Sequence, residues 1–365
     1  MSLFVLMAGG TGGHLFPAMA LAQELARRGH AIHLMTDHRV ASYGAQFPAA
    51  ETHIVPSATP SVRNPVKLLT AGATIAAGIV TARRILRRAR PAAVVGFGGY
   101  PVFPPFFAAR LLGIPGILHE QNAVMGRANR ALASRATAIA LSFERTERTE
   151  GLASKTVLTG NPVRDNVRVA AGTPYGALGP DDPINLVIFA GSQGARAFSD
   201  FVPAALESLP ESLRSRLSVS QQVRPEDMTR VSAAYSAAGI RADLQPFFTD
   251  LPARISGAHL VISRSGASTV ADLTVLGRPA IYVPLPGSID ADQRKNAAVV
   301  EAAGGGWIME QATISPPSLA TRLTSLLGDP TTLQAAAAAA LSLGQPSAVE
   351  RLADLVEDAG RGKSK

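Results

Sequence analysis

The amino-acid sequence contains no cysteine. This absence excludes a disulfide framework, a thiolate nucleophile and a cysteine-based metal site. Aromatic residues make up only 5% of the chain, and no basic run alternates with them as a stacking surface for single-stranded nucleic acid requires. Charged residues make up 17% and apolar residues 47%, a balance that disfavours disorder. We therefore expect a globular protein with no nucleic-acid partner.

Signals for membrane insertion and export are also lacking. The sequence has no run of 18 apolar residues, which predicts no transmembrane helix. The first ten residues, MSLFVLMAGG, have neither the basic start nor the length of a signal peptide. With the absence of cysteine, these features fit a reducing, cytoplasmic environment.

The length and charge suggest the number of domains and the kind of ligand. A chain of 365 residues exceeds the usual size of one domain, so we expect two. The net charge of +8 at neutral pH favours a phosphorylated substrate or an anionic lipid surface.

Short apolar runs alternate with helical patterns along the chain. Helical spacing occurs, for example, at 104–113 and 198–209. Continuous apolar runs are typical of parallel strands that are covered on both faces. The expected strands after the first one (3–7) include 31–37, 92–98, 116–122, 138–141, 184–190, 259–265 and 280–284. The pattern predicts a doubly wound parallel α/β fold.

A repeated motif divides this pattern into two halves. VLMAGGTGGH (5–14) aligns without gaps to VIFAGSQGAR (187–196). Each reads as a strand, a turn of small residues and a helix, so each opens a Rossmann-like domain. The Pro- and Gly-rich stretch 161–183 reads as the linker. We predict domains at 1–163 and 164–346 that face a central ligand-binding cleft.

The first glycine-rich turn, MAGGTGGH (7–14), is suited to an anion. Glycines allow close backbone approach, and amides at a helix N-terminus attract negative charge. The turn is no nucleoside-triphosphate loop, because a Gly-Lys-Ser/Thr end is missing. A dinucleotide reading remains open, with Asp37 as the ribose acid, although Leu15 replaces the third glycine. A turn without a ligand is a further alternative.

Three more turns at strand ends have the same character. They are GFGGYPVFPP (96–105), AGSQGAR (190–196) and SRSGASTVAD (263–272). Two such turns in each half suggest two phosphorylated ligands, both of which could be diphosphates.

Seven motifs together resemble the MurG family of peptidoglycan N-acetylglucosaminyltransferases. In chain order they are GGTGGH (9–14), GFGGYP (96–101), HEQN (119–122), GNPVR (160–164), GSQGAR (191–196), RSGASTV (264–270) and DQRKNA (292–297). The resemblance spans essentially the whole chain. It implies the glycosyltransferase type B fold, with the last helix (347–360) returning to the N-terminal domain.

The resemblance also implies the reaction. N-acetylglucosamine moves from UDP-N-acetylglucosamine to undecaprenyl-diphospho-N-acetylmuramoyl-pentapeptide (lipid I), which gives lipid II for cell-wall growth, cell shape and division. The enzyme would be a peripheral protein on the cytoplasmic face of the bacterial inner membrane.

Donor-binding residues can be carried over where the motifs match. Asp272 stands where the family usually has Glu, and Asp292 stands where it often has His. The implied donor site consists of Thr11, Gly12, Gly13, Asn122, Arg164, Ser192, Phe248, Ala267, Ser268, Thr269, Val270, Ala271, Asp272 and Gln293. We expect Gly98, Gly99, Tyr100 and Glu120 to bind the acceptor, with the lipid diphosphate at the two glycine-rich turns of this half and Tyr100.

His14 is the predicted general base. The acceptor hydroxyl needs a base to become a nucleophile, and the ordinary pKa of histidine suits neutral pH. Attack opposite the departing UDP inverts the anomeric configuration. A capping role for His14 and a rival base at Glu120 remain alternatives, and we expect His119 to orient the HEQN loop.

The remaining expectations concern metal and membrane. Asp290 and Asp292 form a D-x-D sequence that follows an expected strand and loop and precedes a helix, so we read it as the acidic start of that helix rather than a metal site. A metal is also less needed, because amides and Arg164 can stabilise departing UDP. No metal and no cofactor is therefore predicted. Segment 65–91 combines apolar residues with six Lys and Arg residues, a pattern typical of contact with anionic lipid. An ordinary core-facing helix is the alternative.

Other functions remain open on the same fold. A glycolipid synthase would use diacylglycerol as acceptor. A UDP-sugar 2-epimerase would need no lipid, and a nucleotide-sugar sensor would bind without turnover.

Overall fold

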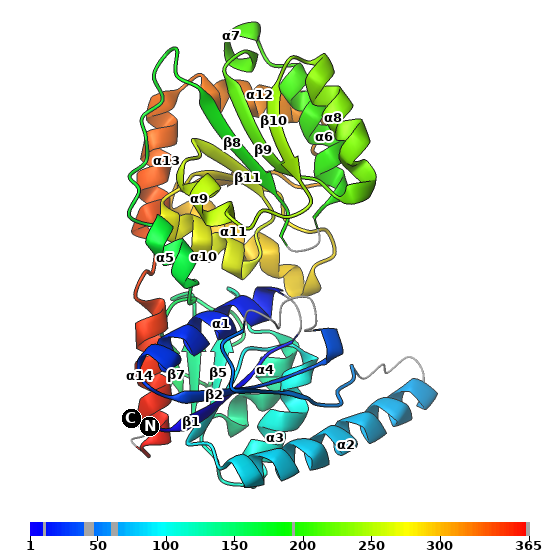
Figure 1. Ribbon diagram of the computed structural model, residues 1–365, viewed down its shortest axis with the longest axis vertical. Coiled ribbons are helices and arrows are strands. Elements are labelled where there is room, and N and C mark those ends of the chain that lie inside the picture. Colours follow the sequence, from blue (N-terminus) through cyan, green and yellow to red (C-terminus); the bar gives the residue numbers. More distant parts are fainter. Residues whose placement is uncertain (10–11, 40–46, 60–64, 192–193, 363–365) are drawn as a thin grey trace. The chain divides into compact units, whose positions relative to one another are not determined.

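The computed structural model describes residues 1–9, 12–39, 47–59, 65–191 and 194–362. The chain divides into two compact units (Figure 1). Unit 1 comprises Met1–Asp165 and Pro346–Lys365, and unit 2 comprises Asn166–Gln345. Each unit is built on a parallel sheet, so the predicted α/β fold with two Rossmann-like domains is confirmed.

The sheet of unit 1 has, in the described residues, seven parallel strands in the order β3-β2-β1-β4-β5-β6-β7. All four residues of β4 and all five of β5 are buried, which explains why their sequences are apolar runs. The strands are β1 (Leu3–Met7), β2 (Ala31–Thr36), β3 (Glu51–Ile54), β4 (Ala93–Gly96), β5 (Gly116–Glu120), β6 (Ala138–Leu141) and β7 (Thr156–Leu158).

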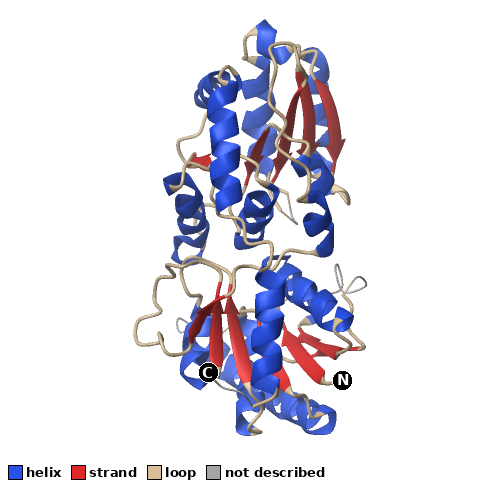
Figure 2. Cartoon of the chain, turned by 90° about the vertical axis from the view of Figure 1, so that its left-hand side faces the viewer, coloured by secondary structure: helices blue, strands red, loops and turns tan. Residues whose placement is uncertain are grey.

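Helices cover both faces of this sheet (Figure 2). Phe4 and Leu6 of β1 pack against α1 and α14, whereas Val5 and Met7 pack against α2 and α3 on the other face. The helices of unit 1 are α1 (Gly12–Arg27), α2 (Pro65–Ala89), α3 (Phe103–Leu111), α4 (Arg127–Leu132) and α14 (Ala348–Gly360), with short 3₁₀ helices at Tyr100–Val102 and Ala133–Arg135.

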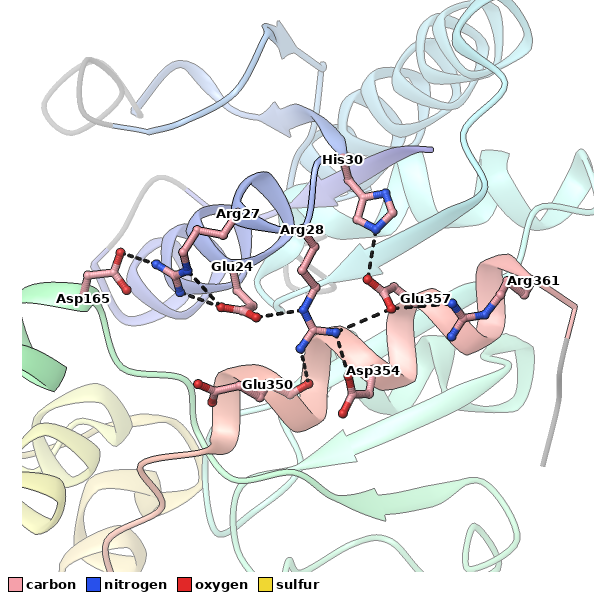
Figure 3. Close-up of polar contacts among 9 residues, drawn as sticks. All are labelled: Glu24, Arg27, Arg28, His30, Asp165, Glu350, Asp354, Glu357 and Arg361. Carbon is pink, nitrogen blue, oxygen red and sulfur yellow. Dashed lines mark hydrogen bonds and ion pairs between the residues drawn. The ribbon is translucent and has the colours of Figure 1, made fainter. Parts of the chain in front are cut away.

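Polar contacts fix the C-terminal helix α14 to α1 (Figure 3). The Arg28 guanidinium donates to Glu24 at 2.8 Å and to Asp354 at 2.6 Å. His30 Nε2 lies 2.9 Å from Glu357. Burial alone raises the pKa of Glu24, but hydrogen bonds from Arg27 and Arg28 lower it below its ordinary value. The end of the chain is therefore an integral part of unit 1.

Helix α2 is the longest helix in the described residues, with 25 residues. By length and composition alone, Val66–Ala89 could cross a membrane. One such helix is weak support for a span, and α2 contributes Ala82 and Leu86 to the core beneath the sheet. It is thus a packed helix of the α/β unit that leaves most of its surface exposed.

Unit 2 repeats the design with a six-stranded parallel sheet, counted over the described residues, in the order β10-β9-β8-β11-β12-β13. Its strands are β8 (Ile184–Phe189), β9 (Leu217–Gln222), β10 (Arg241–Gln245), β11 (Leu260–Ser263), β12 (Ala280–Tyr282) and β13 (Gly306–Ile308). Its main helices are α6 (Arg196–Glu207), α8 (Met228–Ala237), α9 (Leu251–Ser256), α10 (Ala267–Leu276), α11 (Asp292–Ala302), α12 (Pro316–Leu327) and α13 (Pro330–Ser342). Two short helices, α5 (Asp165–Ala170) and α7 (Glu211–Arg214), and short 3₁₀ helices at Pro225–Asp227 and Ile289–Ala291 are also present.

Candidate active site

His14 lies in the first turn of α1, directly after the turn that follows β1. Gly12 is buried and Gly13 is exposed. Thr11, predicted as a donor ligand, lies outside the described residues. The helix therefore begins where the sequence places the glycine-rich turn, with His14 at its N-terminal end.

The turn after β4 lies against the ring of His14. Strands β1 and β4 are neighbours, with Met7 paired to Gly96, so their carboxyl ends lie together. Gly98 and Gly99 have φ angles of 86° and 77°, which favour glycine. A Cβ atom added at either position would lie 3.3 Å from the His14 ring. The structure thus brings together three predicted residues from two motifs.

A hydrogen-bonded chain runs behind His14. His119 Nε2 lies 3.1 Å from the carbonyl oxygen of Gly160. The Gln121 side-chain amide lies 2.9 Å from both His119 Nδ1 and the His119 carbonyl oxygen. Gln121 Oε1 lies 3.4 Å from His14 Nδ1. Buried side chains from β5 and the following turn therefore connect Gly160, in the loop after β7, to His14.

The hydrogen-bond partners in this series determine which ring nitrogen of each histidine carries the proton. A carbonyl oxygen only accepts hydrogen bonds, so His119 carries its proton on Nε2 and accepts at Nδ1. Burial lowers the pKa of His119 to about 4, which keeps it neutral at pH 7. The two acceptors of His119 fix the orientation of the Gln121 amide, so Gln121 Oε1 accepts from His14 Nδ1–H. The lone pair of neutral His14 then lies on Nε2.

The sequence assigns no role to Gln121 of the HEQN motif, because its contact with His14 depends on side-chain conformations that spacing does not predict. The signal that could have found it is the position directly after a buried strand that ends in polar residues.

Glu120 holds the loop after β5. Its carboxylate accepts from the backbone amides of Asn122 (3.0 Å) and Gly126 (2.9 Å) and from the side chain of Asn129 (2.8 Å). The side chain is 1% exposed, and burial raises its pKa even though these hydrogen bonds act in the opposite direction. This geometry favours a loop-positioning role over that of a rival base. Asn122, a predicted donor ligand, is half-buried beside it.

The environment of Asp37 bears on the dinucleotide alternative. Its carboxylate accepts from the Arg39 guanidinium at 2.6 Å and from the Arg39 backbone amide at 3.0 Å. The residue is 2% exposed. Arg39 in turn lies over the Tyr100 ring, 5.0 Å from its centroid. Asp37 therefore orders the residues beside Tyr100 and does not present a carboxylate to a ribose.

Arg164 belongs to unit 1. Its guanidinium lies 4.1 Å from the ring centroid of Phe16 on α1. This contact places a predicted donor ligand beside the helix that carries His14.

The predicted donor residues of unit 2 gather where neighbouring strands end. Ser263 at the end of β11 pairs with Phe189 of β8 and with Tyr282 of β12, so the three following loops emerge side by side. Ser192 lies outside the described residues. Gly191 and Gly194 beside it have φ angles of 91° and 65°.

Helix α10 supplies the predicted run from Ala267 to Asp272. It begins after Gly266, whose position carries no capping side chain. Ser268, Thr269, Ala271 and Asp272 are half-buried, whereas Ala267 and Val270 are buried. The N-terminus of α10 can therefore offer backbone amides and two hydroxyls to an anion.

Two further predicted residues flank this helix. Gln293 lies in the first turn of α11, and its Oε1 accepts from the Leu285 amide at 3.0 Å. Phe248 is 4% exposed, with the Arg254 guanidinium 4.3 Å from its ring centroid. A buried ring at this position leaves the backbone as the part of Phe248 able to meet a ligand.

Arg264 is a structural member of this site to which the sequence assigned no role. Its guanidinium donates to the carbonyl oxygens of Val283 (2.9 Å) and Pro284 (3.1 Å) and to Gln311 (2.6 Å). Burial lowers its pKa. Arg264 thus ties the turn before α10 to the loop that leads to Gln293.

Asp290 and Asp292 flank the start of α11. Asp292 accepts from the Gln293 amide at 2.7 Å, and Asp290 has a φ of 58°. The D-x-D sequence is thus part of a helix start, as predicted from its position. The absence of a metal requirement stays a prediction.

Comparisons with known proteins identify the family of this chain. The glycosyltransferase family 28 N-terminal domain matches residues 4–141, and the family 28 C-terminal domain matches residues 185–354. Proteins named UDP-N-acetylglucosamine--N-acetylmuramyl-(pentapeptide) pyrophosphoryl-undecaprenol N-acetylglucosamine transferase from Brucella abortus (strain S19) and Brucella canis are 51% identical over 362 residues. The matches cover 99% of this chain and 95% of each relative.

Among solved structures, Acinetobacter baumannii MurG matches with a TM-score of 0.79 and 28% identity, over 98% of this chain and all of that one. A UDP-GlcNAc 2-epimerase from Neisseria meningitidis has a TM-score of 0.68 at 14% identity, over 98% of this chain and 100% of that one, a likeness of fold alone. The predicted family is confirmed: the chain belongs to the MurG family within glycosyltransferase family 28.

Proposed function

We propose that this protein transfers N-acetylglucosamine from UDP-N-acetylglucosamine to the C4 hydroxyl of undecaprenyl-diphospho-N-acetylmuramoyl-pentapeptide in peptidoglycan synthesis. The observation that carries the proposal is the 51% identity, over 99% of this chain, to proteins named for this transfer. The alternative acceptors and the epimerase reading have no comparable support.

His14 is our proposed general base. Its Nδ1–H is held by Gln121, which directs the basic lone pair to Nε2. The base takes the proton of the acceptor hydroxyl while that oxygen forms a bond to the anomeric carbon of the donor. The bond from this carbon to the UDP oxygen breaks on the opposite face, so an α-linked donor gives a β-linked product. The proton ends on His14 and the electron pair of the broken bond leaves with UDP.

Unit 2 is the proposed donor unit. Backbone amides and hydroxyls at the start of α10, together with the Gly191 turn and Gln293, suit a sugar diphosphate. Ser192 and Thr11 keep their predicted donor roles, as do Gly12, Gly13, Asn122 and Arg164 from unit 1. No metal is part of the proposal, because amides and Arg164 can stabilise the departing diphosphate.

Unit 1 is the proposed acceptor unit. Gly98 is buried and Gly99 is half-buried; both lie next to the His14 ring, and Tyr100 follows them. These groups suit the lipid diphosphate. Glu120 contributes indirectly, by fixing the loop that carries Gln121 and Asn122.

Helix α2 is the proposed membrane contact at the cytoplasmic face of the inner membrane. Its first turns expose Val66 and Leu69, which are 67% and 75% exposed, next to Lys67. The other end of the segment exposes further cations, namely Arg83, Arg84, Arg87, Arg88 and Arg90. Exposed apolar side chains and a basic cluster on one helix bind anionic headgroups without spanning the bilayer.

Vesicle binding tests the membrane contact. We expect the protein to sediment with phosphatidylglycerol vesicles and less with phosphatidylcholine vesicles, and Leu69→Glu to weaken this binding. Leu341→Glu is the matched control, because Leu341 is an exposed leucine (55%) on α13 of unit 2. Equal weakening by both variants would contradict a docking role for α2.

Product analysis tests the reaction. Purified protein with UDP-N-acetylglucosamine should release UDP only when a lipid I analogue is present, and a β-linked disaccharide should form. Release with diacylglycerol but not with the lipid I analogue would assign the protein to the glycolipid synthases instead.

A further inference from the structure

Three potential metal ligands lie at the edge of the unit 1 sheet, on strands that carry none of the proposed catalytic residues. His33 is on β2, and Glu51 and His53 are on β3, which is the edge strand. The register pairs His33 with Glu51 and Met35 with His53. Paired residues of parallel strands share a face, as do residues two apart on one strand. The three side chains therefore project from one face.

Their ligand atoms converge. His53 Nε2 lies 3.4 Å from His33 Nδ1 and 3.4 Å from Glu51 Oε2. One ligand atom of each residue lies within 4.8 Å of the other two. Within the described part of the chain, this is the one group of three or more His, Asp or Glu residues that meets this condition.

These separations match a tetrahedral cation. Zinc binds histidine nitrogen at about 2.0–2.1 Å and carboxylate oxygen at about 2.0–2.2 Å. The edge of such a tetrahedron is about 1.6 times the bond length, or about 3.2–3.5 Å for these bonds. Both distances from His53 Nε2 fall in this range, and the third pair of ligand atoms lies within 4.8 Å, so side-chain rotation can close the three ligands around a cation.

The surroundings also suit a cation. The side chains of His53 and Glu51 are 19% and 62% exposed, so an ion can enter from solvent and water can complete its coordination. The two imidazole rings are tilted by 58° with centroids 5.4 Å apart. Their nitrogens, rather than their faces, therefore meet. Met35, paired with His53, belongs to the buried core and supports the strand pair.

We propose that His33, Glu51 and His53 bind a divalent transition-metal ion of the zinc class. Two imidazoles and one carboxylate favour zinc over magnesium, which prefers oxygen ligands. The bound ion links β3 to β2 and so restrains the strand that lies at the edge of the sheet in the described part of the chain. This role is structural, because the ligands lie outside the proposed catalytic residues.

Calorimetric titration of untagged, chelator-treated protein with zinc chloride tests the site. We expect about one equivalent of zinc to bind the wild type and magnesium chloride to give no comparable binding. Even the loss of a residue that only hydrogen-bonds to a metal ligand costs about 10- to 100-fold in metal affinity. We therefore expect His33→Ala, His53→Ala and Glu51→Gln each to weaken binding by at least about tenfold.

His38→Ala is the matched control, because His38 is an exposed histidine of the same unit outside the cluster; it should bind zinc like the wild type. Zinc should also raise the melting temperature of the wild type and of this control but not of His53→Ala. Glu51 is exposed, so Glu51→Gln keeps the test valid if a histidine variant misfolds. Zinc affinity in Glu51→Gln and His53→Ala equal to that of the wild type would overturn the proposal.

Discussion

The contact between His14 and the second glycine turn gives a sharp prediction. Replacing Gly98 by Ala places a Cβ atom 3.3 Å from His14 Cε1 and 3.4 Å from His14 Nδ1. Gly113 is a matched control in the same unit. It also has a positive φ, 71° against 86° for Gly98, but a Cβ atom there would have no neighbour within 4 Å among the atoms of the described chain.

The two variants separate backbone strain from contact with His14. A side chain at positive φ costs roughly 1–2 kcal/mol, so both variants should lose about that much stability. In Gly98→Ala the His14 ring must also move by a few tenths of an ångström. The hydrogen bond to Gln121, already 3.4 Å long, would then be lost. Because a displacement of about 1 Å can cost about 100-fold in rate, we expect kcat to fall about 10- to 100-fold.

The assay measures UDP release with a lipid I analogue, together with urea unfolding of each variant. Gly113→Ala should keep kcat within about twofold of the wild type, since it pays only the backbone strain. Equal losses of kcat in both variants would assign the effect to strain, and full activity of Gly98→Ala would refute the proposed contact between this turn and the base.

Three further predictions follow from buried contacts. A Cβ atom at Gly78 of α2 would overlap the backbone oxygen of Pro56, so Gly78→Ala should lower the free energy of unfolding by about 1–3 kcal/mol. Gly72 lies in open space on the same helix, so Gly72→Ala should raise the free energy of unfolding by up to about 1 kcal/mol. Urea unfolding measures both changes, and equal effects would contradict the packing of Gly78 against Pro56. Gln121→Leu should lower kcat by a larger factor than it changes KM, because His14 loses its hydrogen-bond acceptor. Steady-state kinetics measures both constants, and an unchanged kcat would remove Gln121 from the account. The pKa of His119 is lowered from 6.5 to about 4, so the unfolded state takes up a proton at higher pH than the folded state does. The free energy of unfolding should therefore fall by up to about 3 kcal/mol as the pH drops from 6.5 to 4. Unfolding curves of His119→Asn should show a smaller loss of stability over this range.

The sequence predicts the fold well where strands are central and apolar. Strands β1, β4, β5, β8 and β11 lie within predicted apolar runs, because burial on both faces demands such residues. The edge strand β10 (RADLQ) and its neighbour β9 (LSVSQQ) were not among the predicted strands. Their polar residues face solvent or neighbouring side chains, and this weakens the apolar signal.

The candidate site is predicted in part. Glycine-rich turns at the ends of parallel strands must lie at one edge of the sheet, so the meeting of His14 with Gly98 follows from topology. The hydrogen bonds through Gln121 do not follow from topology, because they depend on side-chain rotamers and on the carbonyl of Gly160, which is 41 residues from His119 in the sequence. The buried state of Glu120 likewise follows from loop packing that no motif encodes.

The most direct test of the central claim compares His14→Ala with His30→Gln in UDP release with a lipid I analogue. His30 is a partly buried histidine that precedes β2, at the opposite end of the sheet, where it contacts Glu357. General base catalysis contributes about 10²- to 10⁴-fold. We predict a loss of kcat of that size in His14→Ala, with UDP-N-acetylglucosamine binding retained, and near wild-type activity in His30→Gln. Lipid-dependent release that persists in His14→Ala would contradict the assignment of His14 as the base.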